Sequence, residues 1–487
     1  MKLGPVLHFL GRLTAMVASS MLVPFMCALV FREFQAAGAF LVSGMLTGIV
    51  GFVLILTFRT RSSDLYRGEG ILIVVGGWFL ASLFGALPYL LTGSIAHPID
   101  ALFESASGFT TTGSTILTDI ESLGRAILLW RSFTQWLGGM GIIVLFVALL
   151  PELGAGARFV YKLEVPGPTA KALLPRVRDT ANVLWLIYLV LTAAEVVALL
   201  LAGLGFYDAL THTFSTLSTG GFSPRNASVA AFDSPVVEII IIVFMMLAGA
   251  NFSIYYGLGT QGLRRGMRSL WPDRELRTFV GLILFVSTVV FVNVWARQGF
   301  DNPFRGYLDS VFQTVSILTT TGFGSADFDH WPNLSRLLLV ALMFVGGCAG
   351  STAGGMKIMR VLIGFKMAFR EVRLMFSPNA VLAVFVGRSP VPNQVASSVV
   401  GFILLFVSFW GLGTLALTVG GTDLETSASA AIAVLGNIGP GLGGVGPAEN
   451  FSFFAGWQKL VMIVLMWLGR LEVYPIVAIA TVTFWRH

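Results

Sequence analysis

The sequence DALFESASGFTTTGST, residues 100–115, decides the fold because three later stretches repeat its pattern. Those stretches are DALTHTFSTLSTGGFS (208–223), DSVFQTVSILTTTGFG (309–324) and TSASAAIAVLGNIGPG (426–441). A glycine occupies the fourteenth position of each stretch, and apolar segments flank each one on both sides. Such internal repetition indicates one structural unit used several times. The sequence therefore predicts four copies of a unit made of an apolar span, a short helix, a glycine-containing loop and a second span.

Composition places these units in a membrane. Of the 487 residues, 55% are hydrophobic and 11% are charged, and the mean hydropathy is +0.83. Soluble domains carry about 25% charged residues, so these values exclude a soluble enzyme, a secreted disulfide scaffold and a disordered chain. Ten apolar segments are candidate membrane spans, and they cover residues 9–31, 38–58, 70–93, 126–150, 181–203, 236–257, 277–296, 335–363, 397–419 and 456–484.

The distribution of positive charge predicts the orientation of the chain. Most of the 31 Lys and Arg residues fall at the two ends and in one set of loops, and few, Arg131 among them, fall on the opposite side. The basic side is cytoplasmic by the positive-inside rule. We therefore expect both termini in the cytoplasm and all four short helices to enter from outside. A secondary transporter with inverted repeats would instead give its halves opposite topologies.

The repeats predict how the chain is divided. We expect an all-α integral membrane protein in which four linked span–pore helix–span repeats surround a central pore. The predicted units are two N-terminal spans (1–62), pore repeat 1 (63–150), pore repeat 2 (151–260), pore repeat 3 (261–363) and pore repeat 4 (364–487).

The glycine loops have the chemistry of a cation filter. A short helix that ends near the membrane middle directs its partial negative end toward the axis, and loop carbonyls can replace the hydration shell of a metal ion. Glycine allows the backbone angles that this turn requires. The alternative is that small residues serve helix packing alone. The candidate filter residues are Thr111, Thr112, Gly113, Thr219, Gly220, Gly221, Thr320, Thr321, Gly322, Asn437, Ile438 and Gly439.

Two details of the filter prediction depend on register. Either Gly220 or Gly221 could occupy the key position in the second repeat, and the register favours Gly221. The hydroxyls of 110–112 and 319–321 are candidates for hydrogen bonds behind the filter, although polar packing explains them equally well.

These motifs resemble those of the superfamily of potassium transporters that includes TrkH, TrkG, KtrB and the plant HKT proteins, and the TrkH branch in particular. The matching segments are GFTTTGST, STGGFS, TTTGFGSADF, GNIGPGLG, GGCAGSTAGGMKIMR (346–360) and GRLEVYP (469–475). The resemblance implies channel-like uptake of K⁺ across a bacterial inner membrane. It also implies a homodimer that rests on a cytosolic nucleotide-binding ring of the TrkA type.

The apolar segment 335–363 is a candidate for an intramembrane gate. Each interior glycine costs about 1 kcal/mol of helix propensity relative to alanine, so the glycines of this segment predict a break beneath the filter. The resemblance implies a gating loop at the same place, and the alternative is a close helix crossing through small residues. The candidate gating residues are Gly346, Gly347, Gly350, Ser351, Thr352, Gly354, Gly355, Lys357 and Arg470.

The charged members of this set have alternative interpretations. Lys357 could be a cytoplasmic side chain that extends to the membrane surface. Arg470 falls in the middle of the predicted last span, where charge is costly and usually functional. The resemblance implies that Arg470 controls flux, and the alternative is a structural ion pair between spans. Further acidic residues in apolar segments, with no partner evident in the sequence, are Glu104, Glu195 and Glu238.

The sequence lacks the motifs that would indicate an enzyme or a cofactor-binding protein. There is no P-loop motif and no dinucleotide-binding unit, and Cys27 and Cys348 lack the spacing of metal ligands. We expect no enzymatic activity, no organic cofactor and no nucleic-acid partner. The basic segments 151–180, 260–277 and 364–396 are the predicted docking surface for the cytosolic partner. The functional alternative to channel-like permeation is K⁺ symport coupled to H⁺ or Na⁺.

Overall fold

A computed structural model describes residues 3–58, 67–141, 177–261, 273–299, 302–380, 382–386 and 389–486. Within these ranges the chain is helical except for loops and one small antiparallel pair, in which Phe385 of β1 (Phe385–Val386) faces Pro390 of β2 (Ser389–Pro390). The predicted all-α class is confirmed. Part of the fourth predicted span (142–150) and most of the predicted docking segments 151–180 and 260–277 lie outside the described residues.

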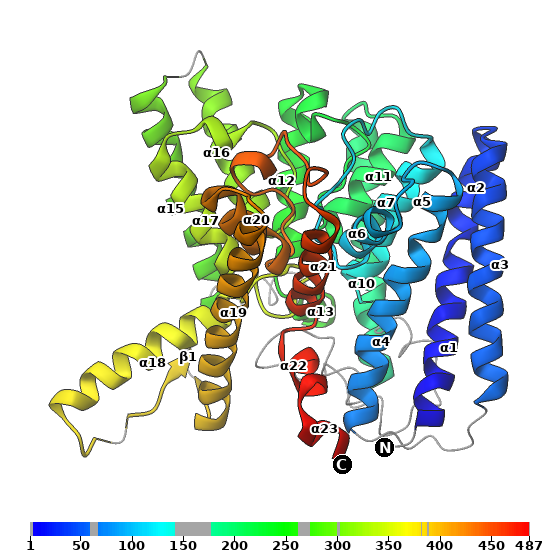
Figure 1. Cartoon of the computed structure of the whole chain (residues 1–487). Coiled ribbons are helices and arrows are strands. Elements are labelled where there is room, and N and C mark those ends of the chain that lie inside the picture. Colours follow the sequence, from blue (N-terminus) through cyan, green and yellow to red (C-terminus); the bar gives the residue numbers. More distant parts are fainter. Residues whose placement is uncertain are drawn as a thin grey trace.

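Two N-terminal helical segments form one side of the molecule (Figure 1). The first consists of α1 (Leu3–Ser20) and α2 (Leu22–Val30), and the second is α3 (Phe34–Thr57). A Cβ atom at Gly11 of α1 would lie 2.8 Å from the carbonyl oxygen of Gly51 in α3. The two backbones therefore approach closely through small residues, as is common between membrane helices.

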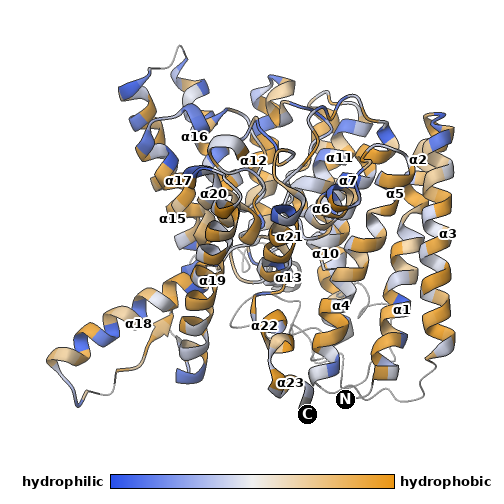
Figure 2. Cartoon of the chain, viewed as in Figure 1, coloured by the Kyte–Doolittle hydropathy of each residue, from blue (hydrophilic) through white to orange (hydrophobic). Residues whose placement is uncertain are grey.

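Within the described ranges, six helical segments are long and apolar enough to cross a membrane, or seven if one bent pair is counted. Figure 2 shows apolar residues along the length of these helices. They match the two N-terminal spans and the first span of every repeat. Besides the N-terminal pair, they are α4–α5 (Arg67–Gly85 and Leu87–Leu91), α10 (Val177–Leu201), α15 (Arg274–Arg297) and α19 (Asn393–Val419).

The second span of each repeat is different, because its helix ends early. The predicted break in 335–363 is present, since α17 (Asn333–Val345) and α18 (Ile358–Phe376) are separated by a loop. The prediction of continuous helices over 236–257 and 456–484 is wrong. The chain instead forms α12 (Pro235–Gly249) and α13 (Phe252–Gln261), then α21 (Gly456–Arg470), α22 (Tyr474–Ala480) and α23 (Val482–Arg486), while α7 (Arg125–Gly139) ends at the corresponding place.

Tertiary contacts explain these early ends. The carbonyl oxygen of Gly249, at the end of α12, accepts a hydrogen bond at 2.9 Å from the amide of Cys348 in another repeat. α21 and α22 meet at a bend of 118°. Backbone groups freed by such breaks are tolerated in a membrane where other protein groups bind them.

The four repeated stretches each contain a short helix, as predicted. These helices are α6 (Pro98–Phe109), α11 (Phe206–Leu217), α16 (Pro303–Leu318) and α20 (Leu424–Leu435). They lie in the upper half of Figure 1, whereas the N and C labels both lie at the lower end. Helix α18 projects away from the rest of the molecule at the lower left.

Candidate ion filter and intramembrane loop

The four loops that follow the short helices share one backbone conformation. The second residue after each short helix has a positive φ, with 55° at Thr111, 54° at Thr219, 58° at Thr320 and 53° at Asn437. For a non-glycine residue this conformation is uncommon and costs free energy. Two residues later comes a glycine with positive φ, and these glycines are Gly113, Gly221, Gly322 and Gly439. The positive φ therefore falls on Gly221 and not on Gly220, as the register predicts.

These glycines form a closed ring of contacts. A Cβ atom at Gly113 would lie 2.1 Å from the carbonyl oxygen of Gly220, and one at Gly221 would lie 2.0 Å from that of Thr321. The series continues from Gly322 to the carbonyl oxygen of Ile438 (1.9 Å) and from Gly439 to that of Thr112 (3.1 Å). Each loop thus abuts the next, and the fourth abuts the first. A side chain at three of these positions would collide with the neighbouring loop.

Three of the four carbonyl oxygens in these contacts are available for a ligand. Among the described residues, no hydrogen-bond donor contacts the carbonyl oxygen of Thr112, Thr321 or Ile438. The fourth, that of Gly220, accepts a hydrogen bond from Nε2 of Gln135 at 2.6 Å. Unpaired carbonyl groups at membrane depth are tolerated where they line a wet pathway. Such oxygens can also take the place of water around a cation.

Polar side chains support the loops, including the threonines for which the sequence leaves hydrogen bonding and polar packing equally open. The hydroxyls of Thr110 and Thr112 lie 2.7 Å apart, and those of Thr319 and Thr321 lie 2.8 Å apart. Nδ2 of Asn437 donates to Oγ1 of Thr112 at 2.9 Å, which joins the fourth loop to the first. The threonine hydroxyls therefore hydrogen-bond within their own repeats, and Asn437 bridges two repeats.

A pocket on one side of the ring is lined by the segments that follow the filter glycines. Its wall includes Gly221, Gly322 and Gly439. At its rim, Nδ2 of Asn226 donates to Oδ1 of Asp119 at 2.9 Å. This hydrogen bond stabilises the carboxylate and lowers the pKa of Asp119. The segments that follow the filter loops of the first two repeats are thus joined at the pocket.

The loop between α17 and α18, residues 346–357, lies against the other side of the ring. The amide of Gly354 donates to Oγ1 of Thr320 at 2.7 Å, and the amide of Gly355 donates to the carbonyl oxygen of Gly436 at 3.0 Å. Oγ1 of Thr352 donates to the carbonyl oxygen of Leu217 at 3.0 Å. This inner loop therefore contacts the ends of the short helices or filter loops of repeats 2, 3 and 4.

Space around the inner loop is too small for side chains at its glycines. A Cβ atom at Gly354 would lie 2.2 Å from the carbonyl oxygen of Gly436, and one at Gly346 would lie 2.4 Å from that of Gly354. Gly346, Gly350 and Gly355 also have positive φ. The glycines thus allow the loop to fold tightly beneath the ring.

Glu275 is a contact of the inner loop that the sequence did not reveal. This side chain at the start of α15 is buried, and its Oε1 accepts a hydrogen bond from the amide of Ala349 at 2.7 Å. Its position within the predicted docking segment 260–277 is the only signal in the sequence. Nothing there indicates which amide it would bind.

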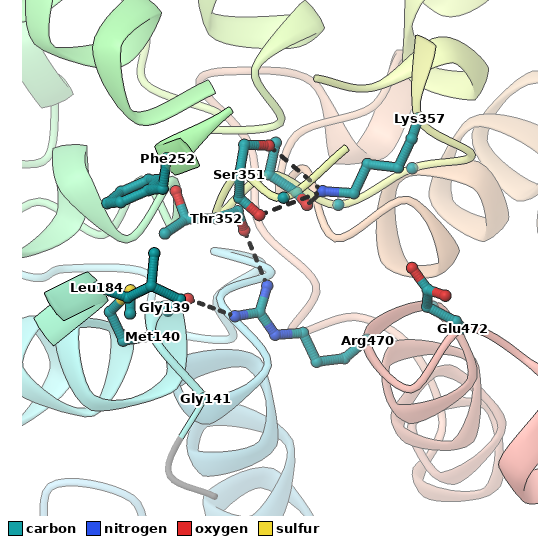
Figure 3. A pocket seen from close by; sticks show the side chains of 15 residues that line it. Gly139, Met140, Gly141, Leu184, Phe252, Ser351, Thr352, Lys357, Arg470 and Glu472 are labelled. Atoms are coloured by element: carbon teal, nitrogen blue, oxygen red, sulfur yellow. Dashed lines mark hydrogen bonds between the residues drawn. The ribbon is translucent and has the colours of Figure 1, made fainter. Parts of the chain in front are cut away.

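Arg470 binds the inner loop and a second repeat at once (Figure 3). Its Nη1 donates to the carbonyl oxygen of Thr352 at 2.9 Å, and its Nη2 donates to that of Gly139 at 3.0 Å. It is the last residue of α21, so its predicted place in the middle of a continuous span is wrong. The neighbouring Glu472 forms an ion pair with Arg360 at 2.5 Å.

Lys357 is buried, with 2% of its surface exposed. Its Nζ hydrogen-bonds to the carbonyl oxygens of Ser351 and Ala353 within the inner loop. The alternative of a side chain that extends to the cytoplasmic surface is therefore wrong, because the carbonyl groups of the loop replace water around the ammonium. Lys357, Arg470 and the loop line one pocket together with Gly139, Met140 and Phe252.

Two of the acidic candidates have partners. Glu104 pairs with Arg131 at 2.8 Å, and Glu238 pairs with Arg305 at 2.8 Å. Arg131, which the charge count places on the side opposite the basic loops, is 1% exposed. The third candidate, Glu195, is fully buried on α10.

Comparisons with known proteins give a consistent picture. A family model described as TrkH, cation transport protein, matches residues 37–485. The Trk system potassium uptake protein TrkH of Salmonella typhimurium is 38% identical over 99% of both chains. TrkG of Escherichia coli, another Trk system potassium uptake protein, is 36% identical over 99% of this chain and 98% of its own. The crystal structure of the potassium transporter TrkH from Vibrio parahaemolyticus has a TM-score of 0.90, 37% identity and full coverage of both chains. The protein described here is thus a multi-pass membrane protein that belongs to the TrkH family of cation transport proteins.

Proposed function

We propose that this protein takes up K⁺ across a bacterial inner membrane by passage through the ring of loop carbonyls. The ring is the observation that carries the proposal, since four loops from four repeats abut one another in a closed order. The relatives named as potassium uptake proteins match over nearly the whole chain, which supports K⁺ as the transported ion. The filter residues are Thr111, Thr112, Gly113, Thr219, Gly220, Gly221, Thr320, Thr321, Gly322, Asn437, Ile438 and Gly439.

The ion would be stabilised by backbone groups rather than by acidic side chains. Each short helix ends directly before its filter loop, and the partial negative charge at a helix C-terminus favours a cation there. Carbonyl oxygens on neighbouring loops would replace the water that K⁺ loses. The hydroxyls of Thr112 and Thr321 hold their loops in place through hydrogen bonds to Thr110 and Thr319.

The inner loop would act as the gate. It contacts a filter loop through Gly354 and also lines the pocket of Lys357 and Arg470, so it would block the route from the ring to the opposite side. Both cationic side chains bind loop carbonyls and would repel a passing cation. Movement of the loop would open the route and displace positive charge from it. Gly346, Gly347, Gly350, Gly354 and Gly355 would permit this movement, with Ser351 and Thr352 as hydrogen-bonding groups.

Association with other chains would take place on the cytoplasmic side. Helix α18 carries the basic residues Lys366, Arg370 and Arg373, and it exposes 66% of Phe369 and 84% of Phe376. These features support a homodimer and docking of a TrkA-type nucleotide-binding ring. We also propose that the chain consists of the five predicted units and that both termini lie in the cytoplasm.

Reconstituted flux tests the proposal against coupled symport. Purified protein in liposomes is assayed with K⁺, Rb⁺, Na⁺ and Li⁺, with and without the cytosolic partner, while the pH and Na⁺ gradients are held at zero. We expect K⁺ flux under these conditions and faster flux when the partner opens the gate. K⁺ movement that requires a proton or Na⁺ gradient would show symport instead.

A further inference from the structure

A buried ion pair lies directly behind the filter loops of the first two repeats. Nε of Arg131, on α7, lies 2.8 Å from Oε1 of Glu104, on α6, and the side chains are 1% and 0% exposed. A buried ion pair contributes little net stability because both charges lose their hydration. The role of this pair therefore depends on the other groups that the two side chains bind.

Glu104 holds the outer end of the first filter loop. Its carboxylate accepts hydrogen bonds from Oγ1 of Thr115 at 3.0 Å and from the amide of Ile116 at 3.0 Å. Both residues follow Gly113 by only two or three positions. The carboxylate therefore fixes the loop just after its ring glycine.

Arg131 also binds the second filter loop. Its Nη1 donates to the carbonyl oxygen of Ser223 at 3.1 Å, and its guanidinium carbon lies 4.2 Å from the centre of the Phe222 ring. Because Arg presents several donors in a rigid plane, one guanidinium can bind Glu104 and this loop simultaneously. The pair thus joins loops that belong to different repeats.

Gln135 holds the same loop one helical turn further along α7. Its Nε2 donates to the carbonyl oxygen of Gly220 at 2.6 Å, while its Oε1 accepts from the amide of Phe222 at 3.0 Å. The two bonds enclose the ring glycine, Gly221, on both sides. Residues four apart share a helix face, so α7 presents Arg131 and Gln135 to one loop.

Side chains on the other short helices bind the corresponding segments within their own repeats. They include two carboxylates, since Asp208 pairs with Arg225 at 2.8 Å and Asp309 accepts a hydrogen bond from Oγ of Ser325 at 2.9 Å. Nε2 of His212 hydrogen-bonds to Oγ of Ser223 at 3.0 Å. Nε2 of Gln313 donates to the carbonyl oxygen of Ala326 at 2.9 Å. Oγ of Ser429 accepts from the amide of Leu442 at 2.9 Å. These bonds stay within one repeat, whereas the ion pair on α6 and α7 connects two.

We propose that Glu104, Arg131 and Gln135 are positioning residues that set ion selectivity by fixing the spacing between the first two filter loops. The proposal rests on the proposed K⁺ conduction. Selectivity among cations depends on the number and arrangement of carbonyl groups that can gather around the ion. Loops that are free to move closer would coordinate the smaller Na⁺ better, so loosening them lowers the preference for K⁺.

The test compares two ion pairs on one short helix. The double variant E104M/R131M removes both charges together, because removal of one would leave the other buried and unpaired. The control D100N/K459M removes the pair between Asp100 and Lys459, whose atoms lie 2.7 Å apart. Within the described residues neither side chain hydrogen-bonds to a filter loop. Full-length proteins in liposomes are assayed for the ratio of K⁺ to Na⁺ flux.

We expect the ratio of K⁺ to Na⁺ flux to fall about tenfold in E104M/R131M, because this variant loses a charge-assisted network that contributes more than one ordinary hydrogen bond. The ratio should stay unchanged in the control. Q135M is a second variant, with a smaller fall in the ratio, for the case that the double variant does not fold. Unchanged ratios in folded E104M/R131M or in Q135M overturn the inference. A wild-type protein without K⁺ preference overturns the proposed function itself, which separates the two failures.

Discussion

Nη1 of Arg470 donates a hydrogen bond to the carbonyl oxygen of Thr352 at 2.9 Å. Thr352 in turn donates its hydroxyl hydrogen to the carbonyl oxygen of Leu217, at the end of a short helix. The last residue of α21 is therefore connected through the inner loop to the base of the second filter loop. A change at Arg470 is expected to act on the gate rather than on ion preference.

Replacement of Arg470 by alanine is expected to raise basal K⁺ flux. The variant loses the bonds to Thr352 and Gly139 and removes a positive charge from the proposed pathway. R470K distinguishes these causes, since lysine keeps the charge without the planar set of donors. Flux in R470K close to that of R470A would identify the bonds as the main cause. Slower flux in folded R470A would contradict the account and favour a structural role.

Addition of one methyl group at Gly354 is expected to displace the inner loop. The new Cβ atom of G354A would lie 2.2 Å from the carbonyl oxygen of Gly436, a distance that requires the loop to move. G411A on α19 is the matched control, because nothing lies within 4 Å of its Cβ position. Partner-independent flux should rise in G354A and remain low in G411A. Normal regulation in G354A would show that the loop is not the gate.

Removal of the Glu275 carboxylate is expected to weaken the closed position of the inner loop. E275A loses the bond to the amide of Ala349, and hydrogen bonds to charged groups contribute about 1.5–3 kcal/mol. Basal flux should rise about tenfold or more if that free energy favours the closed state.

The neighbouring residue Asp273 supplies a control for this change. Its carboxylate caps α15 through the amides of Glu275 and Leu276, and asparagine caps helices nearly as well as aspartate. D273N should therefore leave basal flux unchanged while removing a nearby negative charge. Equal effects of D273N and E275A would indicate a general electrostatic effect instead of the bond to the loop.

The ring glycines are expected to differ in their tolerance of alanine. The Cβ position at Gly439 is 3.1 Å from the nearest carbonyl oxygen, whereas that at Gly322 is 1.9 Å away. G439A should retain more K⁺ flux than G322A, although the positive φ of both residues causes strain in each variant. Liposome flux at equal protein content measures the difference, and an equal loss in both would show that strain outweighs space.

The repeated glycines could be predicted from sequence because positive φ selects for glycine, and the four stretches align on them. The early ends of α12 and α21 could not be predicted from the sequence. Gly249 and Gly469 lie at those ends, but glycine is frequent inside membrane helices, and the breaks depend on contacts from distant segments.

The partners of the charged residues could not be predicted from the sequence either. Arg470 binds backbone carbonyl groups of other repeats, and a carbonyl group has no signature in the sequence. Glu104 was an evident candidate without a partner. The sequence does not identify its partner, Arg131, because a count of charges does not distinguish a buried arginine on a helix from an exposed arginine in a loop.

The central claim, that the ring of loop carbonyls selects K⁺, is tested most directly by the ratio of K⁺ to Na⁺ flux in liposomes for wild type, G113S and G322S. A Cβ atom at either position would lie about 2 Å from the carbonyl oxygen of the next loop, well inside van der Waals contact. The account predicts K⁺ preference in the wild type and loss of that preference in both variants. Undiminished K⁺ preference in folded G113S and G322S would contradict it.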